Sequence, residues 1–186
     1  MGTVEFVGYR HNREDILAGA IAFVREEGLL ALSFGRLAKF VGIADRTIVY
    51  YFPTKDELIA DVLASLAASL QTLLESALGE ERLTMAAAVA RTWAAMTTKD
   101  ADAVFAIYVQ AIGAAAGGVA PYYEAVPLIF AGWIDWMTPR MAAPTLAQRR
   151  SAATGAVAQI DGLLLVRHIG GAALGRQAAR ALGVTT

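Results

Sequence analysis

The stretch "LSFGRLAKFVGIADRTIVYYF", residues 32–52, constrains the fold more than any other part of this 186-residue chain. Ser33 suits the N-cap of a short helix that ends at about Val41, and Gly42 then stops that helix. A second short helix of about two turns starts at Asp45 and is bounded by Pro53. Two short helices joined by a turn that contains glycine, and packed on a longer preceding helix, predict a helix-turn-helix.

The rest of the chain also has helical periodicity. Apolar residues recur at three- and four-residue spacing, and no run of alternating β-branched residues reads as a strand. A left-handed turn at Gly28 should end the first helix, and Thr54 with Glu57 forms a capping box for a long helix. The sequence therefore predicts an all-α fold of about nine helices. Their approximate ranges are 12–27, 33–41, 45–52, 55–78, 83–97, 101–116, 122–137, 145–169 and 174–182.

The chain is rich in apolar residues, with a hydrophobic fraction of 56% and a mean hydropathy of +0.47. The uncharged run from Ala103 to Tyr123 is about as long as a membrane-spanning helix. It is dominated by alanine and glycine and ends near Pro121, so a buried helix is the better interpretation and no membrane partner is expected. The absence of cysteine and of a signal-type N-terminus favours a cytoplasmic location.

The second short helix of the motif carries two different faces. If Ile48 points inward, then Phe52 shares its side, while Arg46 and Tyr50 fall on the outward face. Exposed arginine, threonine and tyrosine side chains can hydrogen-bond to guanine edges, phosphates and sugars. We interpret the helix as a DNA reader, although Tyr51 is equally compatible with the core.

The region from about Arg13 to Ile59 resembles the N-terminal region of tetracycline-repressor-type (TetR-family) transcriptional regulators. The matching residues are Gly42, Ile43, Ala44, Thr47, Ile48, Tyr50, Tyr51, Phe52, Lys55, Glu57 and Leu58. Two positions depart from the family's pattern. Val49 stands where a phosphate-binding tyrosine is usual, and Ala44 stands where a serine or threonine often caps the recognition helix.

The resemblance implies roles for individual residues in DNA binding. It implies phosphate contacts from Ser33, Thr47, Tyr51 and Lys55, and contacts with base edges from Asp45, Arg46 and Tyr50. Gly35 replaces a base-reading arginine of some members, for which Arg36 is a candidate substitute. Residues 1–55 hold seven Lys+Arg and six Asp+Glu, a net charge of +1, so we expect binding to depend on a few cations and on a second subunit.

The resemblance divides the chain into a DNA-binding domain, residues 1–55, and a ligand-binding and dimerisation domain, residues 56–186. We expect a homodimer through the C-terminal helices, where small and apolar residues alternate over residues 151–171; an internal core helix is the alternative. A small, mainly apolar or aromatic effector would bind among large side chains. The candidates are Trp93, Met96, Phe105, Tyr108, Tyr123, Phe130, Trp133 and Met137, with Gln110 or Asp161 as isolated polar groups.

The predicted function is that of a ligand-responsive transcriptional regulator, a repressor that the effector releases from a palindromic double-stranded operator. Enzymatic activity is not expected, because the two histidines, His11 and His168, sit in no metal-ligand spacing and cysteine is absent. No metal or cofactor is predicted. The alternative is a helical interaction module without sequence-specific DNA binding, which Val49 and Gly35 favour.

Overall fold

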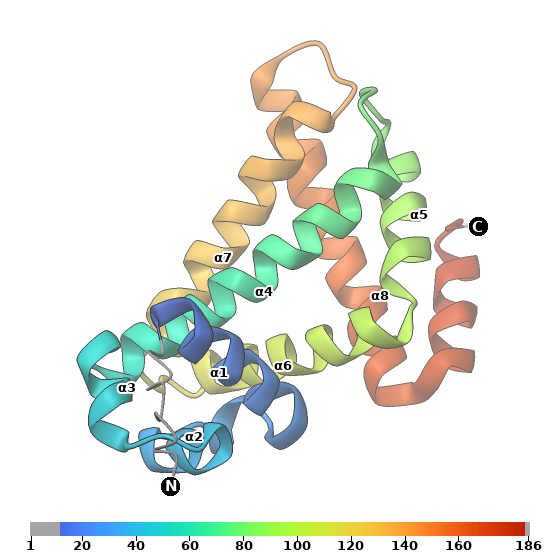
Figure 1. Cartoon of the computed structure of the whole chain (residues 1–186). Coiled ribbons are helices and arrows are strands. Elements are labelled where there is room, and N and C mark those ends of the chain that lie inside the picture. The colour runs from blue at the N-terminus through green and yellow to red at the C-terminus, as the bar shows by residue number, and fades with distance from the viewer. Residues whose placement is uncertain (1–11, 185–186) are drawn as a thin grey trace, which may run out of the picture. The chain divides into compact units, whose positions relative to one another are not determined.

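The computed structural model describes residues 12–184 of the chain (Figure 1). Within these residues it contains eight α-helices, two 3-10 helices and no strand. The all-α fold is thus confirmed, with one α-helix fewer than predicted. The chain divides into two compact units, one that ends at Val62 and one that begins at Leu63. The boundary lies inside a continuous helix, seven residues beyond the predicted division after residue 55.

The first unit contains the predicted helix-turn-helix. Its elements are α1 (Arg13–Glu27), η1 (Leu29–Ala31), α2 (Phe34–Val41), α3 (Asp45–Tyr51) and the first two turns of α4 (Lys55–Leu78). The starts of the helices follow from their capping residues. The side chain of Asn12 accepts a hydrogen bond from the amide of Asp15, and Thr54 Oγ1 accepts one from the amide of Glu57.

Glycines shape both turns of this unit. Gly42 has φ 75° and ψ 31°, the left-handed conformation that ends α2 and allows the chain to reach α3. Gly28 also has a positive φ of 89°, but its ψ of 154° is extended, so the predicted left-handed turn at this position is wrong. The amide of Gly28 still donates to the carbonyl of Val24 at 3.1 Å, but its extended ψ leads the chain directly into η1.

The core of the first unit confirms the inward face predicted for α3. Ile48 and Phe52 are fully buried, together with Leu29, Leu37 and Leu58. The guanidinium of Arg13 lies 4.6 Å above the ring of Phe52 and pairs with Asp61 of α4. These contacts fix α3 against its own unit and leave its other face to solvent.

The second unit is a bundle of helices. It comprises the rest of α4, then α5 (Met85–Met96), α6 (Lys99–Ala116), α7 (Tyr122–Met137), η2 (Thr138–Arg140) and α8 (Leu146–Ala181). Two hydrogen bonds tie the loop before α5 to the loop before α8: Leu83 donates to the carbonyl of Arg140, and Ala142 donates to that of Leu83, both at 2.8 Å. The core includes Leu74, Val89 and Leu163.

Helix α8 contains a sharp break at Gly171, whose φ of 83° and ψ of 168° are not helical. The two predicted helices, 145–169 and 174–182, therefore follow each other almost without a loop, which accounts for the lower helix count. After the break the chain folds back, as the red end of α8 in Figure 1 shows. A Cβ atom on Gly175 would lie 2.6 Å from that of Arg167, so the returning segment packs closely on the first part of α8.

Most apolar residues that were predicted for a dimer interface on α8 are instead buried within the unit. Ala153, Ala156, Ile160 and Leu164 belong to the core, as the alternative of an internal helix predicted. Apolar side chains remain exposed further along the same helix. They are Leu165, Val166, Ile169 and Leu174.

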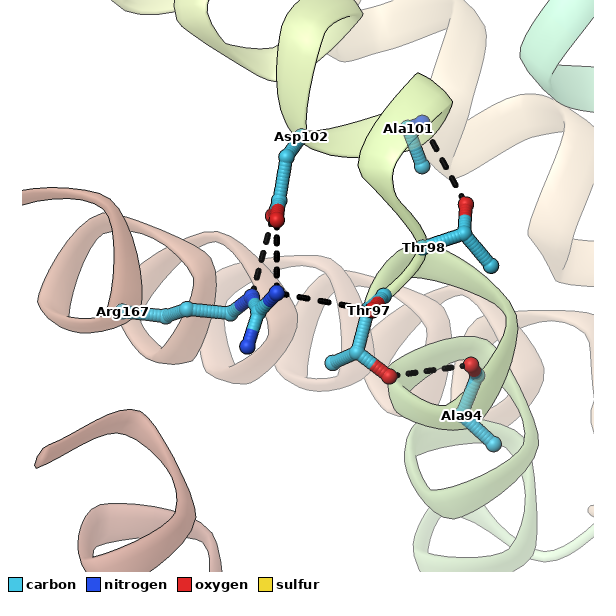
Figure 2. Close-up of polar contacts among 6 residues, drawn as sticks. All are labelled: Ala94, Thr97, Thr98, Ala101, Asp102 and Arg167. Atoms are coloured by element: carbon cyan, nitrogen blue, oxygen red, sulfur yellow. Dashed lines mark hydrogen bonds and ion pairs between the residues drawn. The ribbon is translucent and has the colours of Figure 1, made fainter. Parts of the chain in front are cut away.

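An ion pair joins α6 to α8 close to the break (Figure 2). Arg167 donates from Nε to Asp102 Oδ1 at 2.9 Å and from Nη2 to Asp102 Oδ2 at 2.5 Å. The same Nη2 donates to the carbonyl of Thr97 at 3.4 Å. These contacts connect α8 to α6 just before the chain turns, and the hydrogen bonds to Asp102 raise the pKa of Arg167.

Helices α4 and α8 are long and apolar enough to cross a membrane by length and composition alone. Residues of both helices belong to the core of the second unit. The uncharged run that raised this question in the sequence falls mainly on α6, whose Ala101 and Phe105 also lie in that core. Burial within a bundle accounts for part of these apolar stretches, since 33% of the apolar window of α4 and 22% of that of α8 are buried.

Candidate functional site

The outward face of α3 presents polar side chains to solvent. Arg46 is exposed and makes no ion pair or hydrogen bond within residues 12–184. Tyr50 is 78% exposed, and its ring meets that of Tyr51 edge-on, with centroids 4.9 Å apart. Tyr51 is half-buried, between the two interpretations that the sequence left open. This face combines a free guanidinium with a phenol, both suited to base edges or phosphates.

The two candidates on α2 already have intramolecular roles. Ser33 is the N-cap of α2, and its Oγ accepts a hydrogen bond from the amide of Arg36 at 3.3 Å. Arg36 donates to Glu27 Oε2 at 2.9 Å and lies over the ring of Phe23. Ser33 keeps a hydroxyl hydrogen for a phosphate, whereas the charge of Arg36 is partly neutralised by Glu27.

The remaining candidates lie at the starts of α3 and α4. Asp45 is the first residue of α3, and a Cβ on Gly35 would lie 3.5 Å from its Oδ2. Thr47 is half-buried, and Lys55 is exposed in the first turn of α4. The structure therefore brings Asp45, Arg46 and Tyr50 together on one short helix. Exposed Lys39 of α2, three residues after Arg36, is a further cation that the sequence reasoning did not single out.

The second unit contains a mostly apolar cavity between its helices. It encloses about 730 Å³ of space, which includes solvent at its mouth, and a water molecule's centre can move through about 70 Å³ of it. Side chains of α4, α5, α6, α7 and α8 line it. Those residues are Leu63, Leu66, Ala67, Leu70, Leu74, Thr92, Met96, Val104, Phe105, Ile107, Tyr108, Ile129, Trp133, Met137, Val157, Ile160, Asp161 and Leu164. The narrow interior suits a slim ligand, and a wider one would have to move side chains.

Five of the eight candidate effector-binding residues line this cavity: Met96, Phe105, Tyr108, Trp133 and Met137. The other three do not. Trp93 is buried in the core, and Phe130 packs with its ring centroid 5.8 Å from that of Tyr108. Tyr123 is exposed and donates a hydrogen bond to Glu124. Of the two polar groups considered, Asp161 lies in the lining and Gln110 does not.

The polar lining of the cavity is sparse. Apart from the indole of Trp133, its side-chain polar atoms come from Thr92, Tyr108 and Asp161. Burial raises the pKa of the Asp161 carboxyl to about 7. Burial, and then the charge of Asp161, raise the pKa of the Tyr108 hydroxyl, which keeps that hydroxyl neutral. Thr92 was not predicted, because a single threonine within an alanine-rich helix gives no signal of its own.

No cluster of three or more metal-ligating side chains occurs among the residues that the structure describes. The geometry thus offers two separate features, an outward helix with an unpaired arginine and an apolar cavity with few polar groups.

Comparison with known proteins connects the first of these features to a family. Residues 16–62 match the model of the bacterial regulatory proteins of the tetR family, which covers α1, η1, α2, α3 and the start of α4. The helix-turn-helix segment is thus similar to the DNA-binding region of tetR-family regulators, as the sequence resemblance predicted. In a helix-turn-helix the second helix is the recognition helix, and in this chain that helix is α3. No curated protein matches the sequence.

Solved structures show that the likeness extends to the fold of the second unit. A transcriptional regulator from Rhodococcus sp. Rha1 matches with a TM-score of 0.70 at 18% identity, over 90% of this chain and 91% of its own. A TetR transcriptional regulator from Legionella pneumophila matches with 0.63 at 20% identity, over 92% and 95%. The multidrug binding protein EbrR, complexed with imidazole, matches with 0.69 at 19% identity, over 92% and 87%.

Proposed function

We propose that this protein is a ligand-responsive, DNA-binding transcriptional regulator that acts in the cytoplasm. Its homodimer binds a palindromic operator, and a small, mainly apolar or aromatic effector releases it. The members of its family are regulators and not enzymes, which supports a non-enzymatic role. The effector cavity is proposed at the lining residues of the second unit, among them Met96, Phe105 and Trp133.

The exposed, unpaired Arg46 on the recognition helix is the observation that carries this proposal. In the same unit Arg13 pairs with Asp61, and Arg36 pairs with Glu27. A carboxylate of the chain therefore partly neutralises each of these two guanidinium groups. Arg46 has no such partner among the described residues and is held on a helix whose opposite face is fully buried. An arginine in this position can form two hydrogen bonds with a guanine edge.

A homodimer is proposed because a helix-turn-helix needs two copies to read a palindrome. The exposed apolar residues around the break in α8, of which Ile169 is 76% exposed, offer a surface for a second copy. The effector acts by binding more tightly to a conformation in which the two recognition helices fit the operator poorly. The regulator therefore dissociates from DNA when the effector is present.

The experiment that tests this function is a gel retardation assay with DNA from the protein's own promoter region. We expect sequence-selective retardation at low salt by the wild type. The double variant Arg46→Ala and Tyr50→Ala should bind at least about tenfold more weakly, since a good bidentate arginine contact contributes about 1–3 kcal/mol.

The matched control is Arg25→Ala, which removes an exposed arginine from the last turn of α1. It should weaken binding much less than the double variant. Retardation that does not depend on DNA sequence, or equal effects of the two sets of substitutions, would contradict the proposed function and favour a helical interaction module instead.

A further inference from the structure

The hydroxyl of Thr92 distinguishes the cavity from an ordinary core. Other threonines of the same unit donate their hydroxyl to the carbonyl four residues earlier: Thr72 at 3.2 Å, Thr138 at 2.6 Å and Thr154 at 2.9 Å. Thr92 also lies within a helix and is only 2% exposed, but its Oγ1 has no hydrogen-bond partner among the described residues. A buried hydroxyl without a partner is unfavourable, which suggests that a bound molecule supplies one.

Two further polar groups in the same lining lack partners. The hydroxyl of Tyr108 is buried and accepts or donates no hydrogen bond within the described residues. Asp161 forms no ion pair or hydrogen bond there either. The two groups come from α6 and α8 and lie near enough for the charge of Asp161 to affect Tyr108. The cavity thus holds three unpartnered oxygen-bearing side chains from three helices.

No cation of the described lining balances the carboxylate of Asp161. Among residues 12–184 the lining contains no lysine, arginine or histidine, and its titratable side chains are Asp161 and Tyr108. An anionic ligand would meet the carboxylate of Asp161 in a poorly hydrated space, which is unfavourable. A protonated amine instead carries the missing positive charge and N–H donors, and each of the three oxygen-bearing side chains can accept a hydrogen bond.

We propose that this cavity binds slim, apolar molecules that carry one protonated amine, with the amine at Asp161 and the hydroxyls of Thr92 and Tyr108. This inference deepens the proposed function, since it names the chemical class of the effector. The apolar part of the ligand would lie among side chains such as Met96, Phe105 and Trp133. The narrow space favours an unbranched chain with one aromatic ring over a broad polycyclic molecule.

The test compares three probes of nearly equal shape: 4-phenylbutylamine, 4-phenylbutanol and 4-phenylbutyrate. Isothermal titration calorimetry with the full-length protein at pH 7.5, in the absence of DNA, measures each affinity. We expect the amine to bind at least about tenfold more tightly than the alcohol and the acid to bind most weakly. Asp161→Asn should remove the preference for the amine while it retains binding of the alcohol.

Two other variants refine the test. Thr92→Val keeps the shape of the side chain. It should lower the affinity for the amine severalfold, and the acid should remain the weakest-binding probe. Asp135→Asn removes a carboxylate of α7 that pairs with Arg150 outside the cavity, and it should leave all three affinities unchanged. Circular dichroism confirms that each variant is folded.

Equal affinity for amine and alcohol in the wild type, an amine preference that survives in Asp161→Asn, or no binding of any probe at millimolar concentration would each overturn the inference. The DNA retardation assay is independent of these titrations. If the wild type binds DNA sequence-selectively but does not prefer the amine, only the proposed effector class is refuted. Amine selectivity without DNA binding would refute the regulatory function and leave the binding site intact.

Discussion

At the residue scale, the arginines of the first unit differ in what their guanidinium groups contact. Arg13 packs on Phe52 and pairs with Asp61, so it contributes to the stability of the unit. Arg36 pairs with Glu27, which reduces the charge that it can offer to DNA. Their sequence context did not reveal these pairs, because Asp61 is far along the chain and Glu27 belongs to another helix. Helical periodicity placed Arg46 on the outward face of its helix, and there it makes no ion pair or hydrogen bond with the described residues.

Asp161 supports a prediction about stability and pH. Its pKa is raised from 3.8 to about 7 by burial, so the folded state binds the proton more tightly than the unfolded state. The stabilisation is fully present below about pH 4 and is lost as the pH rises through about 7. A shift of about three units corresponds to roughly 4 kcal/mol, an upper estimate for a side chain that retains some solvent contact.

Asp161→Asn should therefore gain free energy of unfolding relative to the wild type as the pH is raised from 4 to 8. Urea denaturation at several pH values measures this difference for both proteins. We expect the variant to be the more stable one above pH 7, by a few kcal/mol at most. Identical pH profiles for the two proteins would show that the carboxyl is hydrated in the folded state.

At the element scale, replacing glycine by alanine should have opposite effects on stability at a helix end and within a helix. Gly42 has a positive φ between α2 and α3, so Gly42→Ala should lower the free energy of unfolding by about 1 kcal/mol. Gly113 lies exposed in the regular helix α6, where an added Cβ meets no atom, so Gly113→Ala should raise it by up to about 1 kcal/mol. Thermal unfolding compares the two, and a change of the same sign in both would contradict the argument.

The pair of Arg167 with Asp102 is expected to be the most important ion pair between helices of the second unit. Its guanidinium is mostly buried and makes two bonds to one carboxylate, whereas both partners of the pair between Arg150 and Asp135 are exposed. Arg167→Met should therefore cost about 1–3 kcal/mol of unfolding free energy, and Arg150→Met less than about 1 kcal/mol. Urea denaturation distinguishes the two variants, and equal costs would show that desolvation of Arg167 offsets its attraction to Asp102.

Helix boundaries could be predicted where one residue decides them. Gly79 and Pro121 flank α4 and α7, whose observed bounds equal the predicted ranges. The end of α1 was less predictable, because a positive φ at Gly28 is compatible with more than one ψ.

For the candidate cavity, the large aromatic residues marked the helices that form it, but the sequence did not show which of these side chains point into it. Trp93 and Trp133 look alike in sequence, and only packing places Trp133 in the lining and Trp93 in the core.

At the scale of the whole molecule, the predicted domain division follows a sequence motif, whereas the two compact units follow packing. The resemblance to a DNA-binding region placed it after residue 55, where that motif ends. The structure divides the chain at Val62, since the first two turns of α4 carry Leu58 and Ile59 into the core of the first unit. No change of composition marks this point, because one continuous helix contributes residues to both units.

Dimer formation gives the final prediction. Ile169 is 76% exposed beside Val166 in the last turn before the break in α8, and burial of such a side chain against a second copy contributes about 1.5–3 kcal/mol in each subunit. Ile169→Glu would place two like charges in that interface and should convert the dimer to a monomer in sedimentation velocity experiments. The monomer should bind operator DNA far more weakly, because each half-site is then bound independently. Leu146→Glu, which changes an exposed leucine at the opposite end of α8, is the control and should remain dimeric. If Ile169→Glu also remained a dimer with unchanged DNA affinity, the two copies would have to meet through a different surface.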